Sequence, residues 1–316
     1  MRLVAVAPNP SIDRLYELDR LVRDAVNRPR VETRVAGGKG LNVARAARAL
    51  GADASAVALL AGHGGRWMAE ALAAEGIAAR LAWTDGETRT CLAIHDGSDG
   101  TLTELNEAGP EVSPDAWTGL VEALRAELAG GDVGLVTISG SLPPGAPPDG
   151  LSELARTATG AGVEVAVDAA GAALERAFAT QPWLVKLNAA EAAKTLGEPS
   201  LPDEAAAAGA ARRLAARSGG AVVVTRGAEG AIAIDRDGGA FRVAGPAVRG
   251  PYPVGSGDAF LAGLAVGRLR AASFVDALRL AGAAAAANAI RRGAGRLDPA
   301  DVERIAGSII VGPIED

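Results

Sequence analysis

Short apolar runs typical of buried β-strands alternate along the chain with longer segments in which apolar residues recur at helical spacing. The predicted strands of this pattern span residues 3–8, 54–60, 133–138, 163–168, 184–187, 221–225 and 231–234. The predicted helices span residues 40–50, 65–75, 114–128, 151–160, 204–218, 258–270 and 274–290. Strands that alternate with helices form a mostly parallel sheet with helices on both faces, so we expect a three-layer α/β fold.

Two stretches depart from this alternation, because strands with alternating polarity follow one another with no helix between them. They join residues 15–18 with 31–36 and residues 89–95 with 101–105. We therefore expect a small separate sheet, with strands from about residues 12–36 and 85–106, that lies over the main sheet as a lid. The edges of such a sheet invite pairing, which favours a homodimer joined through the lids. No low-complexity linker interrupts the chain, and a single domain over residues 1–316 is expected.

Composition narrows the classes of function. The chain has 49% hydrophobic and 22% charged residues, as globular proteins do. Its formal net charge of −6 provides no general basic field for nucleic acid or an anionic membrane, so any bound phosphate must meet a local cluster of positive groups. Cys91 is the only cysteine, which excludes an internal disulfide and fits a reducing compartment. With Pro8 close to the start and no apolar run of about 20 residues, we expect a cytoplasmic protein.

Residues 37–44 read Gly-Gly-Lys-Gly-Leu-Asn-Val-Ala and lead into a predicted helix. Glycines at the mouth of a helix let backbone amides approach a ligand, and the helix N-terminus favours an anion or an electron-rich hydroxyl. The segment is not a Walker A loop, because Gly40 follows Lys39 where Ser or Thr is needed, and Val43 replaces the third glycine of a dinucleotide fingerprint. By itself, an ordinary tight turn explains it about as well.

A second glycine segment, residues 253–264, opens a helix that is apolar on every side. Asp258 at the entrance of this buried helix is costly unless something satisfies it. The simplest interpretation is a helix cap. However, the glycines on either side of Ser256 keep side chains away from the amides at the helix start, and such amides can stabilise developing phosphoryl charge. A base and an anion hole would then share one turn.

Together these segments resemble the two signatures of the PfkB, or ribokinase-like, family of carbohydrate kinases. Residues 37–51 resemble the first signature, residues 255–260 the second, and residues 188–191 the Asn-x-x-Glu element of the family. Residues 9–13 and 139–143 resemble elements of the branch that contains 1-phosphofructokinase and tagatose-6-phosphate kinase. The five motifs lie in family order over essentially the whole chain. The resemblance implies the same α/β fold and β lid as the pattern of elements.

The resemblance also implies a role for each motif residue. Asp258 would accept the proton of the attacking hydroxyl, and Asn188 with Glu191 would organise Mg²⁺, through water, around the phosphates of ATP. The anion hole would be formed by Gly255, Ser256 and Gly257. The sugar side would be formed by Asp13, Gly38, Lys39, Asn42 and Ser139, and the nucleotide side by Lys186, Thr225, Gly227, Gly230 and Asn288. Asn188 as an N-cap with Glu191 as a first-turn acid remains an alternative.

Three cations near the sugar side point to an acceptor that carries a phosphate. Arg28 and Arg89 match positions where phosphosugar-specific relatives place phosphate-binding cations, and guanidinium suits bidentate phosphate recognition. Lys39 lies within the glycine segment itself and is one of only three lysines in the chain. Arginine is abundant here, so each arginine taken singly also fits a solvated surface position.

We therefore expect an ATP-dependent phosphosugar kinase that converts D-fructose 1-phosphate to fructose 1,6-bisphosphate. Alternative acceptors are tagatose 6-phosphate, fructose 6-phosphate, or another sugar or nucleoside, because Tyr252 and Ala36 depart from the residues common in this branch. A non-catalytic sugar- or nucleotide-binding regulator on a kinase fold is the alternative from another class. The presence of Asp258 favours the enzyme. The expected partners are the sugar phosphate, ATP and Mg²⁺, with neither nucleic acid nor membrane.

Overall fold

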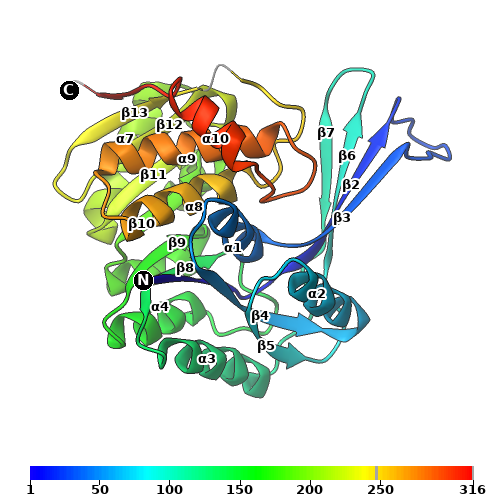
Figure 1. Cartoon of the computed structure of the whole chain (residues 1–316), viewed down its shortest axis with the longest axis horizontal. Coiled ribbons are helices and arrows are strands. Elements are labelled where there is room, and N and C mark those ends of the chain that lie inside the picture. Colours follow the sequence, from blue (N-terminus) through cyan, green and yellow to red (C-terminus); the bar gives the residue numbers. More distant parts are fainter. Residues whose placement is uncertain (246–247, 315–316) are drawn as a thin grey trace.

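The large sheet forms the centre of the protein, which is represented by a computed structural model that describes residues 1–245 and 248–314 (Figure 1). Its strands are β1 (Arg2–Ala7), β4 (Ala54–Ala61), β5 (Ala79–Thr84), β8 (Val133–Ser139), β9 (Glu164–Asp168), β10 (Leu184–Asn188), β11 (Ala221–Thr225), β12 (Gly230–Ile234), β13 (Ala240–Ala244) and β14 (Val311–Pro313). Their order is β14-β13-β12-β11-β10-β9-β8-β1-β4-β5. Neighbours are parallel from β5 to β11 and antiparallel from β11 to β14. The prediction of a mostly parallel sheet is confirmed.

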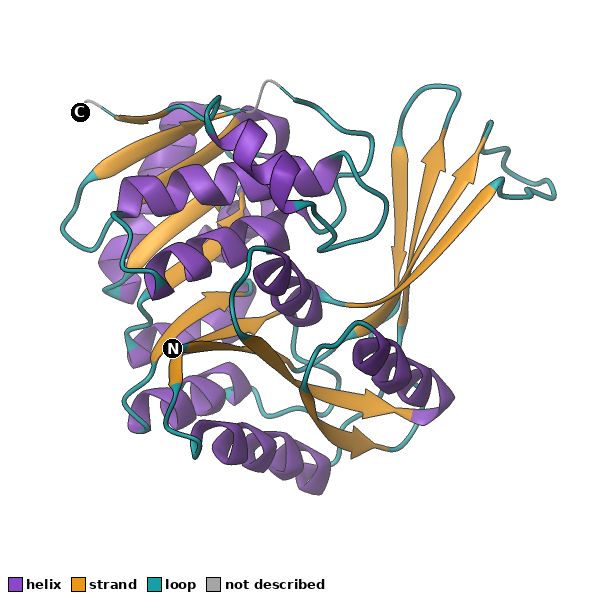
Figure 2. Ribbon diagram, in the orientation of Figure 1, coloured by secondary structure: helices purple, strands orange, loops and turns teal. Residues whose placement is uncertain are grey.

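Helices cover both faces of this sheet, so the three-layer prediction is also confirmed (Figure 2). The first core, on one face, includes α1 (Lys39–Ala49), α2 (Gly62–Ala74), α8 (Ser256–Leu269), α9 (Phe274–Ala289) and α10 (Pro299–Ala306). The second core, on the other face, includes α3 (Pro114–Leu128), α4 (Gly150–Gly160), α5 (Gly171–Ala177), α6 (Ala189–Leu196) and α7 (Glu204–Ser218). Two short 3₁₀ turns are η1 (Phe178–Thr180) and η2 (Gly227–Glu229). None of the helices in the described ranges is both long and apolar enough to span a bilayer.

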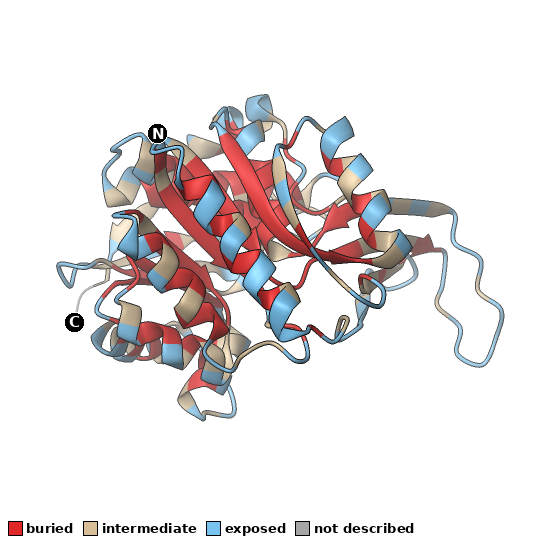
Figure 3. Cartoon of the chain, turned by 90° about the horizontal axis from the view of Figure 1, so that it is seen from below, coloured by how far each residue is buried: buried red, intermediate tan, exposed pale blue. Residues whose placement is uncertain are grey.

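A second, four-stranded sheet is present where the sequence predicted one. Its strands are β2 (Ser11–Leu18), β3 (Val31–Gly37), β6 (Thr90–Asp96) and β7 (Leu102–Asn106), in the order β3-β2-β6-β7. This small sheet projects from the body, and the loop at its outer end is exposed (Figures 1 and 3). Arg292 ties its outer part to the body through two contacts with the Glu17 carboxylate, at 2.6 and 3.0 Å. Arg34 stacks on Trp67 of α2, 3.6 Å from the ring centroid.

Close packing between α8 and α9 sets the position of the α8 N-terminus. A Cβ atom added to Gly263 would lie 2.5 Å from the Cα of Ala281, and one added to Gly267 would lie 2.6 Å from the Cβ of Ala277. Only glycine permits such an approach, and it lets the two helix backbones pack against each other. The α8 helix is buried from Asp258 to Gly267, so its first turn cannot shift without disturbing the core.

Candidate active site

Three neighbouring parallel strands end in polar side chains that lie side by side. Ser139 of β8 pairs in register with Asp168 of β9, and Asp168 pairs with Lys186 of β10. Two residues earlier the same face carries Ala166 and Leu184, which belong to the core beneath α1 and α8. Since side chains alternate between faces, Asp168 and Lys186 face α1 and α8 as well. The face therefore changes from apolar core to a polar site at the carboxyl edge of the sheet, where open α/β proteins bind ligands.

A buried carboxylate joins two lysines at this edge. Asp168 is fully buried, with its Oδ2 2.7 Å from the Nζ of Lys186 and its Oδ1 2.7 Å from the Nζ of Lys39. The Lys39 ammonium also lies 2.8 Å from Oε1 of Glu191. Burial opposes ionisation of Asp168, but the two ammonium groups outweigh it and lower the pKa of the carboxyl. Asp168 was not among the residues predicted for the site, although an acid that ends a buried strand at this edge is a usable signal.

The glycine turn before α8 brings a cation to the start of that helix. Gly255 has φ 82° and caps the helix, and a Cβ atom there would lie 2.7 Å from the Cα of Ala294. A Cβ atom on Gly257 would lie 2.8 Å from the Nζ of Lys186. The Ser256 amide donates to the Pro253 carbonyl at 3.0 Å. Because the Ser256 amide is already engaged, an anion hole would rest on the amides of Gly255 and Gly257 together with the Lys186 ammonium. The sequence had predicted three amides.

Asp258 lies in the first turn of α8, beside this cation. Its side chain accepts a hydrogen bond from Nδ2 of Asn42 at 2.9 Å, and the residue is 6% exposed. Burial, followed by the negative charge of Asp168, raises the pKa of Asp258 to about 7, while Lys186, Lys39 and Asn42 oppose the rise. A carboxylate with a pKa near neutral is suited to general base catalysis.

Asp13, Gly38 and Asn42 meet next to Asp258, as the sequence predicted for one site. Oδ1 of Asp13 accepts from Oγ of Ser11 at 2.6 Å, and its Oδ2 accepts from the Gly38 amide at 3.1 Å and from Nδ2 of Asn42 at 3.4 Å. Burial raises the pKa of Asp13, although these donors act in the opposite direction. The Asn42 amide therefore connects two carboxylates, one at the end of the small sheet and one at the start of α8.

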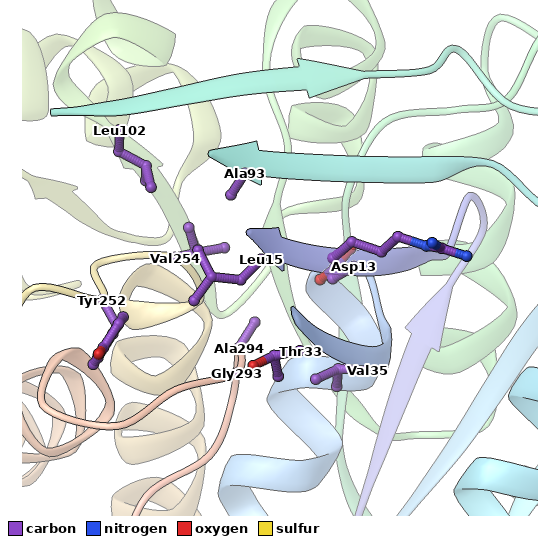
Figure 4. A pocket seen from close by; sticks show the side chains of 11 residues that line it. Asp13, Leu15, Thr33, Val35, Ala93, Leu102, Tyr252, Val254, Gly293 and Ala294 are labelled. Atoms are coloured by element: carbon purple, nitrogen blue, oxygen red, sulfur yellow. The ribbon is translucent and has the colours of Figure 1, made fainter. Parts of the chain in front are cut away.

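A pocket opens between the small sheet and the loops beside α8. Leu15 and Ala93 of the small sheet face Tyr252 and Val254 across it, and Asp13 also lines it (Figure 4). The small sheet therefore covers a cavity that leads to Asp13.

The remaining residues expected on the sugar side differ in their positions, and Ser139 lies beside Asp168. Oγ of Ser139 is buried and has no hydrogen-bond partner within the described ranges. Arg89 donates to the Asn9 carbonyl at 2.8 and 3.1 Å and to the Glu107 carbonyl at 3.1 Å, which leaves two of its five N–H groups. Arg28 is exposed in the loop beyond the tip of the β2–β3 hairpin. The structure does not bring it to Asp13 of the same chain.

Asn188 and Glu191 form a capping box at the start of α6. Oδ1 of Asn188 accepts from the Glu191 amide, and Oε2 of Glu191 accepts from the Asn188 amide, both at 2.8 Å. The alternative of a helix cap is thus realised. Among the described residues, no three acidic, histidine or cysteine side chains gather as a metal cluster. One carboxylate and one amide oxygen at an exposed helix start fit Mg²⁺, which keeps several waters and binds phosphate oxygens.

The other residues expected on the nucleotide side differ in how closely the rest of the protein packs around them. Thr225 pairs in register with Asn188, and the Gly227 turn is open, with no atom within 4 Å of an added Cβ. Gly230, with φ 94°, packs against the Val243 carbonyl. Asn288 is fully buried.

Every polar group of Asn288 is engaged within the protein. Its Nδ2 donates to the Val254 carbonyl at 2.9 Å and to Oγ of Ser256 at 3.1 Å, and its Oδ1 accepts from the Gly295 amide at 2.8 Å. These contacts hold the glycine turn at the position that the family resemblance places on the nucleotide side. We propose that it acts through the turn.

Comparisons with known proteins identify the family of the chain. Residues 7–301 match the pfkB family carbohydrate kinase family. The chain is 34% identical over 320 residues to 1-phosphofructokinase of Xanthomonas campestris pv. campestris, with 99% of each chain covered. A possible 1-phosphofructokinase from Thermotoga maritima superposes with a TM-score of 0.89, 26% identity and 100% of both chains covered. The tetrameric inhibited form of phosphofructokinase-2 from Escherichia coli gives a TM-score of 0.86, with 26% identity and coverage of 97% of this chain and 98% of that one. The chain belongs to the PfkB family of carbohydrate kinases.

Proposed function

We propose that the chain transfers the γ-phosphoryl group of ATP to D-fructose 1-phosphate and forms fructose 1,6-bisphosphate and ADP. The observation that carries this proposal is Asp258, a buried carboxylate with a pKa of about 7 beside the ammonium of Lys186 and a glycine turn. The 34% identity to a 1-phosphofructokinase over the full length supports the acceptor. We also place the reaction in the cytoplasm, where ATP is available.

The residues suggest how the transfer proceeds. Asp258 accepts the proton as the acceptor oxygen attacks the γ-phosphorus, and the bond from that phosphorus to the β-phosphate oxygen breaks. Lys186 and the amides at the start of α8 face the charge that develops on the phosphoryl oxygens. When bound, Mg²⁺ neutralises phosphate charge, and Asn188 with Glu191 would hold its waters.

The acceptor would bind between Asp258 and the pocket beneath the small sheet. Asp13 and Asn42 supply hydrogen-bonding groups for sugar hydroxyls, and the glycine at position 38 lets the chain approach closely. Its φ is 87°, and a Cβ atom there would lie 2.8 Å from the Cα of Pro10. This arrangement would place a hydroxyl next to the base and the rest of the sugar under the small sheet.

ADP release over a panel of acceptors tests the proposed function. The panel contains fructose 1-phosphate, fructose 6-phosphate, tagatose 6-phosphate and unphosphorylated fructose. We expect the highest kcat/KM with fructose 1-phosphate. A higher value with another sugar phosphate would favour that alternative acceptor, and the absence of ADP release with every member would support the non-catalytic regulator.

Arg89→Ala should remove most of the preference for fructose 1-phosphate over fructose. The guanidinium has two N–H groups left for an acceptor phosphate, and a charge-assisted contact contributes roughly 1.5–3 kcal/mol. The KM for fructose 1-phosphate should rise about ten- to a hundredfold, with the KM for ATP nearly unchanged. Arg34→Ala is the matched control, because Arg34 stacks on Trp67 away from the site. A defect confined to ATP would contradict this role for Arg89.

We further propose that the small sheet joins two copies of the chain. Leu105 on β7 is 57% exposed, and the register places it on the same face as Leu92, opposite the face that lines the pocket. β7 is an edge strand of the small sheet, and an edge strand with an exposed apolar side chain invites pairing. The matched phosphofructokinase-2 structure is itself tetrameric.

Sedimentation at micromolar concentration should show a dimer. Leu105→Glu should weaken it at least tenfold, because a charge would be buried in the interface. Glu104→Gln, on the opposite face of the same strand, is the control. A monomeric unmodified protein would contradict the proposal.

A further inference from the structure

The orientation of one amide decides how the candidate base is held. An asparagine side chain has an oxygen that accepts and an NH₂ group that donates. For Asn42, the NH₂ group faces Asp258 at 2.9 Å and Asp13 at 3.4 Å. If the amide were turned over, its oxygen would face two carboxylates and both hydrogen bonds would be lost. The structure must therefore contain a feature that favours this orientation.

Arg45 provides that feature. It lies one turn after Asn42 on α1, is 8% exposed, and donates from Nη1 to Oδ1 of Asn42 at 3.1 Å. A guanidinium has only donors, so the Asn42 oxygen must face it. The guanidinium is itself fixed by the Glu75 carboxylate at 2.7 Å and the Ala36 carbonyl at 2.6 Å. It cannot turn away without leaving buried groups unpaired.

We propose that Arg45 is a positioning residue for the kinase reaction: it fixes the Asn42 amide so that the amide donates to Asp258 and Asp13 together. This inference rests on the proposed function. Arg45 touches neither the acceptor nor the base, and it acts through Asn42. Sequence analysis assigned it no role, because an arginine within a helix is usually a solvated surface residue.

A change at Arg45 should then alter how Asp258 titrates. Asp258 is faced by Asp168 of β9, Lys186 of β10, and Lys39 and Asn42 of α1, and the Asn42 hydrogen bond lowers its pKa. When the amide is free to turn, this bond weakens and the pKa rises. The acid limb, which is the low-pH side of the pH profile of kcat/KM, should therefore move to higher pH by roughly half a unit. A purely structural arginine would change stability and leave that limb in place.

Arg45→Lys tests the proposal, because the lysine keeps the charge but offers a single nitrogen in place of the fork that reaches both Asn42 and Ala36. We expect kcat to fall about tenfold and the KM for the acceptor to rise, with the KM for ATP unchanged. Arg270→Lys is the matched control, since Arg270 donates to the Leu50 carbonyl at the far end of α1. Glu75→Gln removes the charge of the ion pair but keeps an oxygen that can accept from Nε of Arg45, so it should lower the thermal midpoint without moving the acid limb.

A double-mutant cycle distinguishes action through Asn42 from a general loss of packing. Arg45→Lys added to Asn42→Ala should change kcat by less than about twofold, because the group on which Arg45 acts is already gone. Losses that multiply, or an Arg45→Lys enzyme with unchanged kcat and acid limb, would overturn the inference. In either case the proposed function stands if the unmodified enzyme phosphorylates the acceptor. Absence of phosphoryl transfer in the unmodified enzyme would overturn both.

Discussion

Asp258→Asn should lower kcat by roughly 10²–10⁴-fold while the thermal midpoint stays within a few degrees of the unmodified enzyme. The asparagine keeps an oxygen that can accept from Nδ2 of Asn42, now 2.9 Å from the carboxylate. It cannot take up the proton of the acceptor hydroxyl. Steady-state ADP release, with thermal unfolding measured alongside, tests this expectation.

Asp276→Asn is the matched control for that variant. Asp276 is also an acid in the first turn of a buried helix, where it accepts from Oγ of Ser273 at 2.7 Å, but it lies at the start of α9, outside the candidate site. It should leave kcat within about twofold. Near-normal turnover of Asp258→Asn would exclude Asp258 as the base. A loss of stability with turnover retained in the folded fraction would instead indicate a helix cap.

Asp168→Asn should have the largest effect on stability, about 3–5 kcal/mol, measured as the free energy of unfolding in urea. The carboxylate is fully buried and is bonded to Lys186, which is 3% exposed, so its loss leaves a buried ammonium without a counter-charge. Lys39 keeps Glu191 as a partner. Loss of the Asp168 charge should also lower the pKa of Asp258 and move the acid limb of kcat/KM to lower pH, because that charge raises the pKa.

The double variant Asp168→Asn/Lys186→Met separates the charge effect from a packing effect. Removing both charges should recover most of the lost stability, since replacement of a buried ion pair by neutral groups is often close to neutral. If the double variant is no more stable than Asp168→Asn, the unpaired ammonium is not the cause of the loss.

The main sheet and its long helices could be predicted from the sequence because their apolar runs are long and fully buried. The elements that the pattern did not predict are short or lie at edges, where few side chains are buried: β5, β13, β14, α5, α6 and α10. The small sheet was predicted because no helix separates its strands. Its strands differ from the prediction at their ends, because β2 begins at Ser11, whereas the pattern predicted a strand from Leu15.

Sequence motifs predicted the two glycine segments that the structure brings together at Asp258, but not the residues that connect them. Asp168 lies in no motif quoted for the family, and Arg45 lies within the first signature but has no role assigned from it; the roles of both depend on which strands and loops are neighbours. Arg28 shows the opposite limit. The Glu17–Val31 pair is the last pair of the β2–β3 hairpin, and Glu17 lies four residues, or roughly 13 Å, along the strand from Asp13. Arg28 lies beyond that pair. The motifs do not show that an extended hairpin separates Arg28 from Asp13.

The pH dependence of kcat/KM for the acceptor tests the central claim most directly. A carboxylate base works only when it is deprotonated, and burial together with Asp168 raises the pKa of Asp258 to about 7. Activity should therefore be full above that value and fall tenfold for each unit below it, with an acid limb of apparent pKa about 7 measured between about pH 5 and 9 at saturating ATP. A profile that stays flat down to about pH 5 would show that no group with this pKa accepts the proton, and would contradict the account.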